Sequence, residues 1–346
     1  MRILITGGAG MVGSHAAEIW AGQGHQVIVL DNLMRSTLFG SQRQSVEFNW
    51  RFLETVPNVT RIKGDVREAE DVRRALGDGV DVVLHAAGQP GVGYSIANAQ
   101  EDFSINAAGT LQVLEQVRRA CPKAAVLYCS TNKVYGTSVD TLAIEEQPTR
   151  YAFRAAVAGV PETMSVDLAG HTPYGVSKLT GDFYMQDYAY TYGLRTAVFR
   201  MSCIYGTRQF GFEDQGWIAH FVICAVLGRP VTIYGTGKQV RDVLYVTDLV
   251  RAYDAFLRSG RAHGVYNIGG GSGQTLSLLE LVKELEGLLG RKMRISFTDW
   301  RPSDQRVYIS DIRKAAAELG WKPDVSPADG VRRLAAWVNE NRRLFA

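Results

Sequence analysis

A tyrosine and a lysine near the middle of the chain have the types and spacing that proton transfer at an alcohol requires. Tyr174 and Lys178 stand four residues apart in Tyr-Gly-Val-Ser-Lys, so they would share one face of a helix. A phenol ordinarily loses its proton near pH ~10, and a nearby ammonium favours the phenolate and lowers that pKa. Tyr174 is therefore predicted to serve as base and as acid in hydride chemistry on an alcohol. Thr131, just past a predicted strand, offers a hydroxyl that positions the same oxygen.

A glycine-rich segment at the start of the chain predicts the cofactor for this chemistry. Gly7, Gly10 and Gly13 follow a short apolar run. The first glycine permits a tight turn, the second lets the backbone approach a pyrophosphate, and the third allows close packing of helix on strand. The helix N-terminus, with Met11 and Val12, then binds the anion. A Tyr-x-x-x-Lys alone is more often a surface pair, but beside a dinucleotide loop we expect it to be catalytic.

Two acids after the next strands are candidates for binding the rest of the dinucleotide. Asp31 lies 18 residues after Gly13, where an acid accepts hydrogen bonds from the adenine ribose. Its charge would repel a 2′-phosphate, which favours NAD over NADP, although Arg35 nearby weakens the preference. Asp65 either meets the adenine amino group or caps a helix over 68–76.

Small and polar residues at the ends of later strands complete the predicted cofactor site. Ala86, Ala87 and Gly88 either contact a flat cofactor or form an ordinary tight turn. Asn106 either lines the site or supports the sheet. Further predicted contacts to the cofactor come from Asn32, Val66, Ser130, Tyr174 and Lys178.

The first half of the chain alternates apolar runs with helical patterns, and these elements must position the candidates. The runs are continuous in Val, Ile and Leu, which is typical of strands buried on both faces of a parallel sheet. Strand–helix alternation of this kind predicts an α/β fold with a doubly wound parallel sheet of the Rossmann type. The predicted strands are 2–6, 26–30, 60–63, 81–85, 124–129 and 195–200, and the helices are 11–21, 68–76, 106–120 and 174–192.

A different pattern in the second half predicts a smaller C-terminal α/β lobe that binds substrate. Residues 137–172 form a long irregular stretch, which in a compact domain is often a lid. The predicted division is 1–203 with 239–262 for the NAD-binding domain and 204–238 with 263–346 for the lobe. In this half we predict strands 231–234, 265–268 and 293–297, helices 277–289, 311–319 and 328–341, and a strand followed by a helix in 242–259.

Bulk properties favour a cytoplasmic protein without nucleic-acid or membrane partners. The formal net charge is +3 and is spread along the chain, with no basic arm. The four cysteines have no metal-ligand spacing, so we expect inert thiols and no metal. No apolar stretch approaches the ~20 residues of a membrane helix, and the opening apolar run is too short for a signal peptide.

Together, these motifs resemble the extended short-chain dehydrogenase/reductase family. The resemblance is carried by Gly-x-x-Gly-x-x-Gly, by Thr131 four residues before Tyr135, and by Tyr-x-x-x-Lys. The nucleotide-sugar epimerases and dehydratases of that family look similar over the whole chain. The resemblance implies that Arg241 and Arg301 clamp a substrate diphosphate, which suits the guanidinium fork.

Within the family, several stretches look most like epimerases that act at C2 of a CDP-linked hexose. They include Ser-Thr-Asn-Lys-Val-Tyr-Gly from 130 and His-Ala-Ala-Gly-Gln from 85. Family 4,6-dehydratases place Asp-Glu directly after the threonine, whereas this chain has Asn132 and Lys133, so elimination of water is not expected. The implied reaction passes through a 2-keto sugar with NAD recycled in place. The predicted substrate-binding residues are Gln89, Thr131, Asn132, Ser202, Gln209, Gln215, Arg241, Arg301 and Asp304, with Trp217 as a further candidate.

Two other functions stay open. A UDP-hexose 4-epimerase would use the same machinery at C4, and a non-catalytic NAD-binding regulator would share the fold. The resemblance also implies a homodimer or homotetramer, with helices 106–120 and 174–192 as candidates for the interface.

Overall fold

The computed structural model describes residues 1–38, 43–154, 157–301 and 304–345, and the chain divides into two compact units. Unit 1 comprises 1–134, 171–200 and 250–266, and unit 2 comprises 135–170, 201–249 and 267–346. Relative to the division expected from the sequence, 135–170, 201–203 and 239–249 group with the second unit and 263–266 with the first. Residues 135–170 bond to later parts of the second unit, since Tyr151 donates its backbone N–H to Lys238 and Val160 donates to Ile309.

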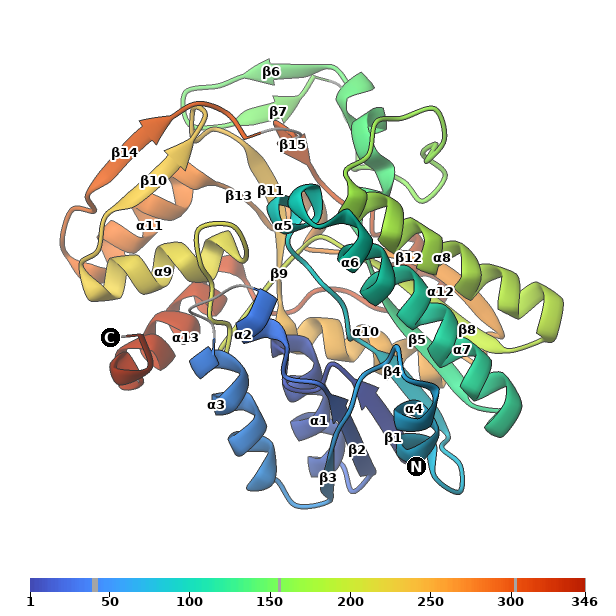
Figure 1. Cartoon of the computed structure of the whole chain (residues 1–346). Helices are drawn as coiled ribbons and strands as arrows, with labels where there is room; N and C mark the ends of the chain where they lie inside the picture. The colour runs from blue at the N-terminus through green and yellow to red at the C-terminus, as the bar shows by residue number, and fades with distance from the viewer. Residues whose placement is uncertain (39–42, 155–156, 302–303, 346) are drawn as a thin grey trace. The chain divides into compact units, whose positions relative to one another are not determined.

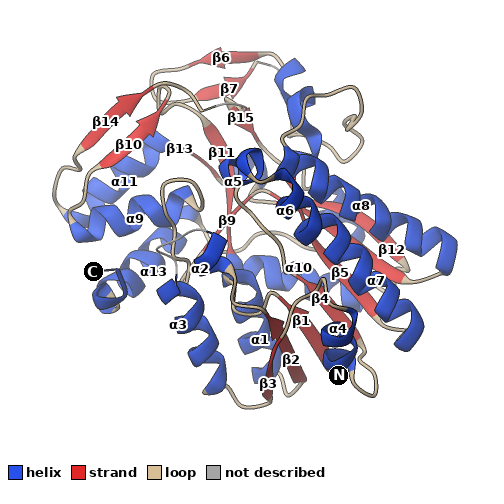
Figure 2. Ribbon diagram, viewed as in Figure 1, coloured by secondary structure: helices blue, strands red, loops and turns tan. Residues whose placement is uncertain are grey.

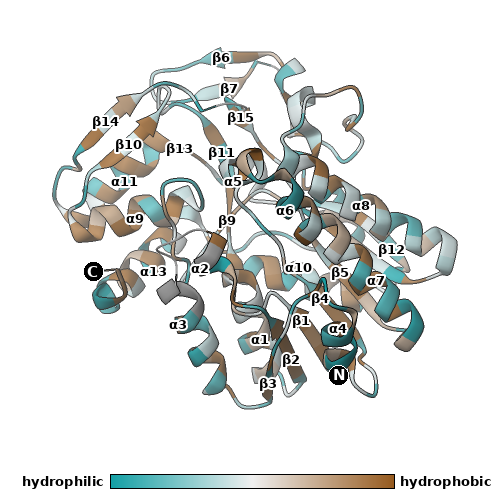
Figure 3. Cartoon of the chain, in the orientation of Figure 1, coloured by the Kyte–Doolittle hydropathy of each residue, from teal (hydrophilic) through white to brown (hydrophobic). Residues whose placement is uncertain are grey.

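Unit 1 is built on a seven-stranded sheet of order β12-β8-β5-β4-β1-β2-β3. The pairs β4–β5, β1–β4, β1–β2 and β2–β3 are parallel. Strands β1, β2, β4 and β5 are almost wholly buried, as their continuous apolar sequences predict, whereas β3 at the edge of the sheet is partly exposed. The central strands are brown in the hydropathy view of Figure 3. The strands are β1 (Arg2–Thr6), β2 (Gln26–Asp31), β3 (Val59–Lys63), β4 (Val82–His85), β5 (Ala125–Thr131), β8 (Arg195–Met201) and β12 (His263–Ile268).

Helices flank this sheet, as in the doubly wound fold that the sequence predicts (Figures 1 and 2). In one row α4, α7 and α8 contact one another, and α1 contacts α3 in another. The helices are α1 (Met11–Gly22), α2 (Arg35–Leu38), α3 (Arg43–Glu54), α4 (Ala69–Leu76), α5 (Val92–Ala97), α6 (Ala99–Phe103), the π-helical turn η1 (Ser104–Ala108), α7 (Gly109–Ala120), α8 (Pro173–Tyr192) and α10 (Val246–Arg258).

Unit 2 contains smaller sheets. Strand β11 pairs in parallel with β9 and β15 and antiparallel with β13, while β10 pairs with β14 and β6 with β7. The strands are β6 (Ile144–Glu146), β7 (Tyr151–Phe153), β9 (Cys203–Tyr205), β10 (Val231–Tyr234), β11 (Val240–Tyr245), β13 (Thr275–Ser277), β14 (Ile295–Thr298) and β15 (Val307–Tyr308). The helices are η2 (Asn132–Thr141), which begins at the end of unit 1, α9 (Trp217–Leu227), η3 (Gly271–Gly273), α11 (Leu278–Leu289), α12 (Arg313–Leu319), α13 (Pro327–Glu340) and η4 (Arg342–Phe345).

Across the parts of the chain that the structure describes, every helix is too short or too polar to cross a membrane.

Candidate active site

The glycine-rich loop joins β1 to α1 and leaves the start of that helix available for an anion. Gly7 has φ +70°, and a Cβ there would lie 2.5 Å from the backbone nitrogen of Ala87. A Cβ at Gly13 would lie 2.5 Å from the carbonyl oxygen of Gly7, so the helix rests directly on the loop. Gly10 is the N-cap and provides no side-chain bond, and the first turn, with Met11 and Val12, carries no acid. Amide hydrogens and a helix dipole at such an end fit a pyrophosphate.

Asp31 is the last residue of β2, and its carboxylate holds this loop in place through hydrogen bonds. Its Oδ2 accepts a hydrogen bond from the Ala9 amide at 2.9 Å, and its Oδ1 accepts one from the Leu33 amide at 2.8 Å. Burial raises the pKa of Asp31, and the two amide bonds oppose that rise. In α2, burial lowers the pKa of Arg35 to about 10.

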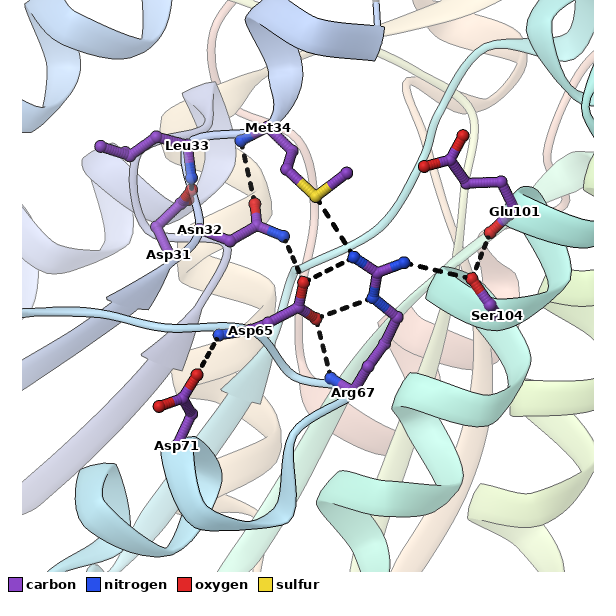
Figure 4. A network of polar contacts seen from close by, with 9 residues as sticks. All are labelled: Asp31, Asn32, Leu33, Met34, Asp65, Arg67, Asp71, Glu101 and Ser104. Atoms are coloured by element: carbon purple, nitrogen blue, oxygen red, sulfur yellow. Dashed lines mark hydrogen bonds and ion pairs between the residues drawn. The ribbon is translucent and has the colours of Figure 1, made fainter.

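Asp65 belongs to a polar network at the ends of β2 and β3 (Figure 4). Its Oδ2 accepts hydrogen bonds from Asn32 Nδ2 at 2.9 Å and from Arg67 Nη2 at 2.7 Å. The alternative that Asp65 caps the following helix is wrong, because α4 begins at Ala69 with Glu68 as its N-cap. Arg67 is a member of this network that was not predicted from the sequence. The sequence signal that could have identified Arg67 is its position two residues after an acid at the end of a strand.

The turn after β4 approaches the reactive lysine closely. Ala86 and Ala87 donate their amides to the carbonyl and hydroxyl oxygens of Thr6, at 3.1 and 3.3 Å. A Cβ on Gly88 would lie 3.0 Å from Asn106 Oδ1 and 3.7 Å from Lys178 Nζ. A side chain here would therefore press on the Asn106 amide and contact Lys178.

Asn106 and Gln89 both support this turn. Asn106 lies in η1, where its Oδ1 accepts the Gln89 amide at 2.9 Å and its Nδ2 donates to the Gln89 carbonyl at 3.0 Å. Gln89 is fully buried, and its Nε2 donates to Gly91 O and to Asp102 Oδ1. Both amide hydrogens of Gln89 are thus engaged within unit 1, so the expectation that this side chain contacts the sugar finds no support in this arrangement.

The reactive segment lies in the first turns of α8. Thr172 is the N-cap and accepts from the Gly175 amide at 3.3 Å, and Pro173 occupies the first turn. These residues start the helix one position before Tyr174. The next turn brings Lys178 into the interior, where its Nζ lies 4.2 Å from the centre of the Tyr128 ring.

The pKa values of this pair differ from the sequence expectation. Burial raises the pKa of Tyr174 to about 12, although a hydrogen bond with Thr131 opposes the rise. Burial also lowers the pKa of Lys178 to about 8. The expectation that the ammonium would set the tyrosine's pKa is therefore wrong for the protein alone, because desolvation disfavours both charged forms. At neutral pH, Tyr174 holds its proton and Lys178 is mostly charged.

The polar residues next to Thr131 in the chain form hydrogen bonds with other side chains of the protein. Ser130 donates to Asp182 at 2.9 Å, so its hydroxyl faces α8 within the core. Asn132 is buried, and its Oδ1 accepts from Thr131 Oγ1 at 3.4 Å. Val66 is also buried and packs against Gly109. In unit 1 the structure thus brings Thr131, Tyr174 and Lys178 together and places the others around them as support.

The remaining predicted substrate residues lie in unit 2, and two of them are arginines with acidic partners. Arg241 on β11 is buried and donates to Asp304 Oδ1 at 2.6 Å. Arg301 lies 3.1 Å from Asp214 Oδ1 and stacks over the Tyr234 ring at 4.0 Å. Both guanidinium groups are held in place, as an anion site requires.

Four other residues of unit 2 have mostly local contacts. Ser202 donates to the carboxylate of Asp242, and Trp217 Nε1 donates to Cys203 Sγ at 3.3 Å. Gln209 is buried and donates to Ile204 O at 3.3 Å, and Gln215 exchanges backbone hydrogen bonds with Phe212. A direct substrate role for these four stays a prediction.

Comparisons with known proteins agree with this fold. Residues 3–269 match the NAD dependent epimerase/dehydratase family. Over 347 aligned residues the chain is 40% identical to CDP-paratose 2-epimerase of Salmonella typhi, covering 98% of this chain and 99% of that protein.

Solved structures of similar proteins cover the same length. UDP-glucose 4-epimerase of Thermotoga maritima, solved with UDP-glucose, is 29% identical with a TM-score of 0.82 and covers 99% of this chain and 100% of that chain. UDP-glucuronic acid 4-epimerase of Bacillus cereus, solved with UDP-glucuronic acid and NAD, is 27% identical with a TM-score of 0.80 and the same coverage.

Proposed function

Because this chain belongs to the NAD dependent epimerase/dehydratase family, we propose that it epimerises a nucleotide sugar at C2, converting CDP-paratose to CDP-tyvelose or acting on a related CDP-hexose. The observation that carries the proposal is the 40% identity to CDP-paratose 2-epimerase over nearly the whole of both chains. The buried Thr131 and Lys178 and the half-buried Tyr174 support it, since a reaction at a hydroxyl-bearing carbon needs such groups.

The protein's own residues have distinct roles in this reaction. NAD, when bound, would supply the hydride acceptor and donor for the sugar carbon. Tyr174 takes the proton of the reacting hydroxyl and gives it back, and Thr131 holds the same oxygen. Lys178 supplies positive charge beside Gly88, where it holds the nicotinamide ribose. Because burial keeps the Tyr174 proton on the phenol, its action as a base requires added positive charge in the loaded site.

Amides and arginines supply the binding energy for the two diphosphates. The uncapped start of α1, behind Gly10, binds the diphosphate of NAD. In unit 2, Arg241 and Arg301 bind that of the nucleotide sugar, with Asp304 orienting Arg241. Arginine suits this role because its fork bonds two phosphate oxygens at once.

The test is product analysis without any added redox partner. The purified protein is incubated with CDP-paratose and, separately, with UDP-glucose, and the sugars are identified afterwards. Conversion of CDP-paratose to its C2 epimer supports the proposal. Galactose from UDP-glucose, with CDP-paratose unchanged, would instead establish the second candidate.

That second candidate is a UDP-hexose 4-epimerase. The structural similarity to two 4-epimerases favours it, because both superpose over nearly the whole chain. The same Tyr174 and Lys178 would then act at C4, and only the orientation of the sugar would differ.

The proposed assembly is a homodimer or homotetramer through α7 and α8. Phe183 and Tyr184 on α8 are 49% and 36% exposed, as expected of an apolar face that a second copy covers. Light scattering of the purified protein measures its mass and tests the assembly.

The proposed compartment is the cytoplasm, where free thiols such as the four of this chain persist.

A further inference from the structure

One buried carboxylate beside the reactive pair has no role in the chemistry described so far. Asp102, near the end of α6, is fully buried. Its Oδ1 accepts from Gln89 Nε2 at 2.7 Å and from Asn106 Nδ2 at 3.1 Å, and its Oδ2 accepts from Ser177 Oγ at 2.5 Å. An ionised group without solvent is costly unless its charge is compensated.

The donors to Asp102 come from three elements that surround the reactive lysine. Gln89 belongs to the turn after β4, Asn106 to η1 and Ser177 to α8. Ser177 immediately precedes Lys178, and its Oγ also lies 3.1 Å from the carbonyl oxygen of Tyr174. The carboxylate therefore ties the turn beside Gly88 to the helical segment that carries both reactive side chains.

Burial raises the pKa of Asp102, and its hydrogen bonds and the charge of Lys178 oppose that rise. All three donors are neutral, so they stabilise the carboxylate without cancelling its charge. Asp182 is different, because it forms a buried ion pair with Arg200 at 2.9 Å. The charge of Asp102 favours the charged form of Lys178 and disfavours the phenolate of Tyr174. Its field thus acts on both reactive groups in the low-dielectric interior.

We propose that Asp102 is a positioning residue of the epimerase reaction, whose carboxylate fixes the Gln89 turn against α8 and acts on the Lys178 ammonium through its charge. The inference rests on the proposed roles of Tyr174 and Lys178. It assigns a function to Asp102, a fully buried carboxylate at a position where an apolar side chain would be expected.

Other titratable groups face Lys178, and each must be considered. Asp182 and Tyr174 lie on its own helix, Tyr128 and Cys129 come from β5, and His85 comes from β4. Burial keeps His85 and Cys129 neutral at physiological pH, and Asp182 is paired with Arg200. Asp102 is therefore the carboxylate whose removal leaves the Lys178 ammonium least compensated.

The experiment titrates Lys178 directly, by NMR of lysine-labelled holoenzyme, with Lys178→Met to assign its signal. In Asp102→Asn, a change of charge with nearly unchanged shape, we expect the midpoint for loss of the Lys178 proton to fall by about one pH unit from its wild-type value. The alkaline limb of kcat/KM should fall by the same amount. Asp254→Asn is the matched control, because that carboxylate also holds a side-chain bond, to Trp20 in the same unit, and its midpoint should not move.

A second substitution separates charge from packing. Ser177→Ala deletes one hydrogen bond to the Asp102 carboxylate and keeps the charge of that carboxylate. It should therefore lower the rate of epimerisation without moving the alkaline limb of kcat/KM to lower pH. If Asp102→Asn does not fold, Asp102→Ser removes the same charge with a smaller side chain. We expect the same fall in the midpoint for loss of the Lys178 proton in that variant. An unchanged Lys178 midpoint in a folded neutral variant would overturn the proposal. The titration needs no sugar, so failure of the proposed substrate is recognised separately.

Discussion

At the scale of single residues, Tyr174 is the group whose removal distinguishes catalysis from binding. Tyr174→Phe removes the phenolic oxygen and leaves the ring, so folding and NAD content should persist. We expect the rate of epimerisation to fall by about 10²–10⁴-fold. The measurement is turnover of CDP-paratose together with bound NAD. The control is Tyr190→Phe, which alters a tyrosine that is 75% exposed on the same helix. Unchanged turnover in Tyr174→Phe would favour a protein that only binds NAD.

His85 predicts how stability depends on pH. It is buried between the hydroxyls of Thr6 and Thr110, and burial, with the charge of Lys178, lowers its pKa to about 3. An unfolded histidine has a pKa of ~6.5, so below that pH the unfolded chain binds a proton that the folded protein does not. The free energy of unfolding should therefore fall on acidification, by about 2 kcal/mol from this group between pH ~7 and ~5.

Urea unfolding at several pH values measures this effect. His85→Gln should flatten the dependence on pH even if it lowers stability at every pH. His263→Gln changes an exposed histidine and should retain the wild-type slope. Equal slopes in all three proteins would contradict the assignment of the effect to His85.

At the scale of elements, α1 contains two glycines whose replacement by alanine should have opposite effects on stability. Gly13→Ala places a methyl group 2.5 Å from Gly7 O and 2.6 Å from Gly8 Cα, so loop and helix must separate. We expect NAD affinity to fall and stability to drop by about 1–3 kcal/mol. Gly22→Ala, at the end of the same helix, meets nothing within 4 Å and should raise stability by about 0.5–1 kcal/mol. Thermal melts with and without NAD measure both.

Strand β11 carries the arginine that we expect to bind the substrate diphosphate. Arg241→Met keeps much of the apolar stem and deletes the charge, so the Kd for CDP should rise about 10–100-fold, the value of one charged hydrogen bond. Calorimetric titration with CDP measures the change. Combining it with Asp304→Asn avoids leaving an unpaired carboxylate, and Arg332→Met, at an exposed cation of the same unit, should leave the Kd unchanged.

At the scale of the whole molecule, the motifs and the strands of the seven-stranded sheet were predictable from sequence, whereas the buried polar support and the short strands β6, β7, β9, β13 and β15 were not. Strands β1 and β10 occupy the predicted residues because short apolar runs bounded by turns leave little choice. Helices α2, α5 and α6 were missed because they are short, and the π-helical turn was missed because it retains helical periodicity. The longer helices α3 and α9 were also not predicted. Gln89 was predicted to bind substrate and Asp102 was not singled out, since nothing in a local pattern shows that distant segments bury both side chains.

The sequence also could not give the division into units. Residues 135–170 follow the sheet domain in the chain, yet their backbone bonds go to Lys238 and Ile309, far away in sequence. Such pairing depends on the folded arrangement of long-range partners, which local propensity does not encode. The family, in contrast, was predictable because its motifs combine rare residue types at fixed spacing.

The strand order of unit 1 has a consequence for synthesis on the ribosome. The first five strands of the sheet are complete at residue 131, but their neighbour β8 begins at Arg195, and β12, the last strand of the sheet, begins at His263. At the usual pace of translation this interval lasts on the order of ten seconds, during which the nascent sheet presents the open edge of β5 or β8. An open edge invites pairing with other chains. We therefore expect chaperone dependence during expression, and aggregation of any nascent chain released before β12 emerges.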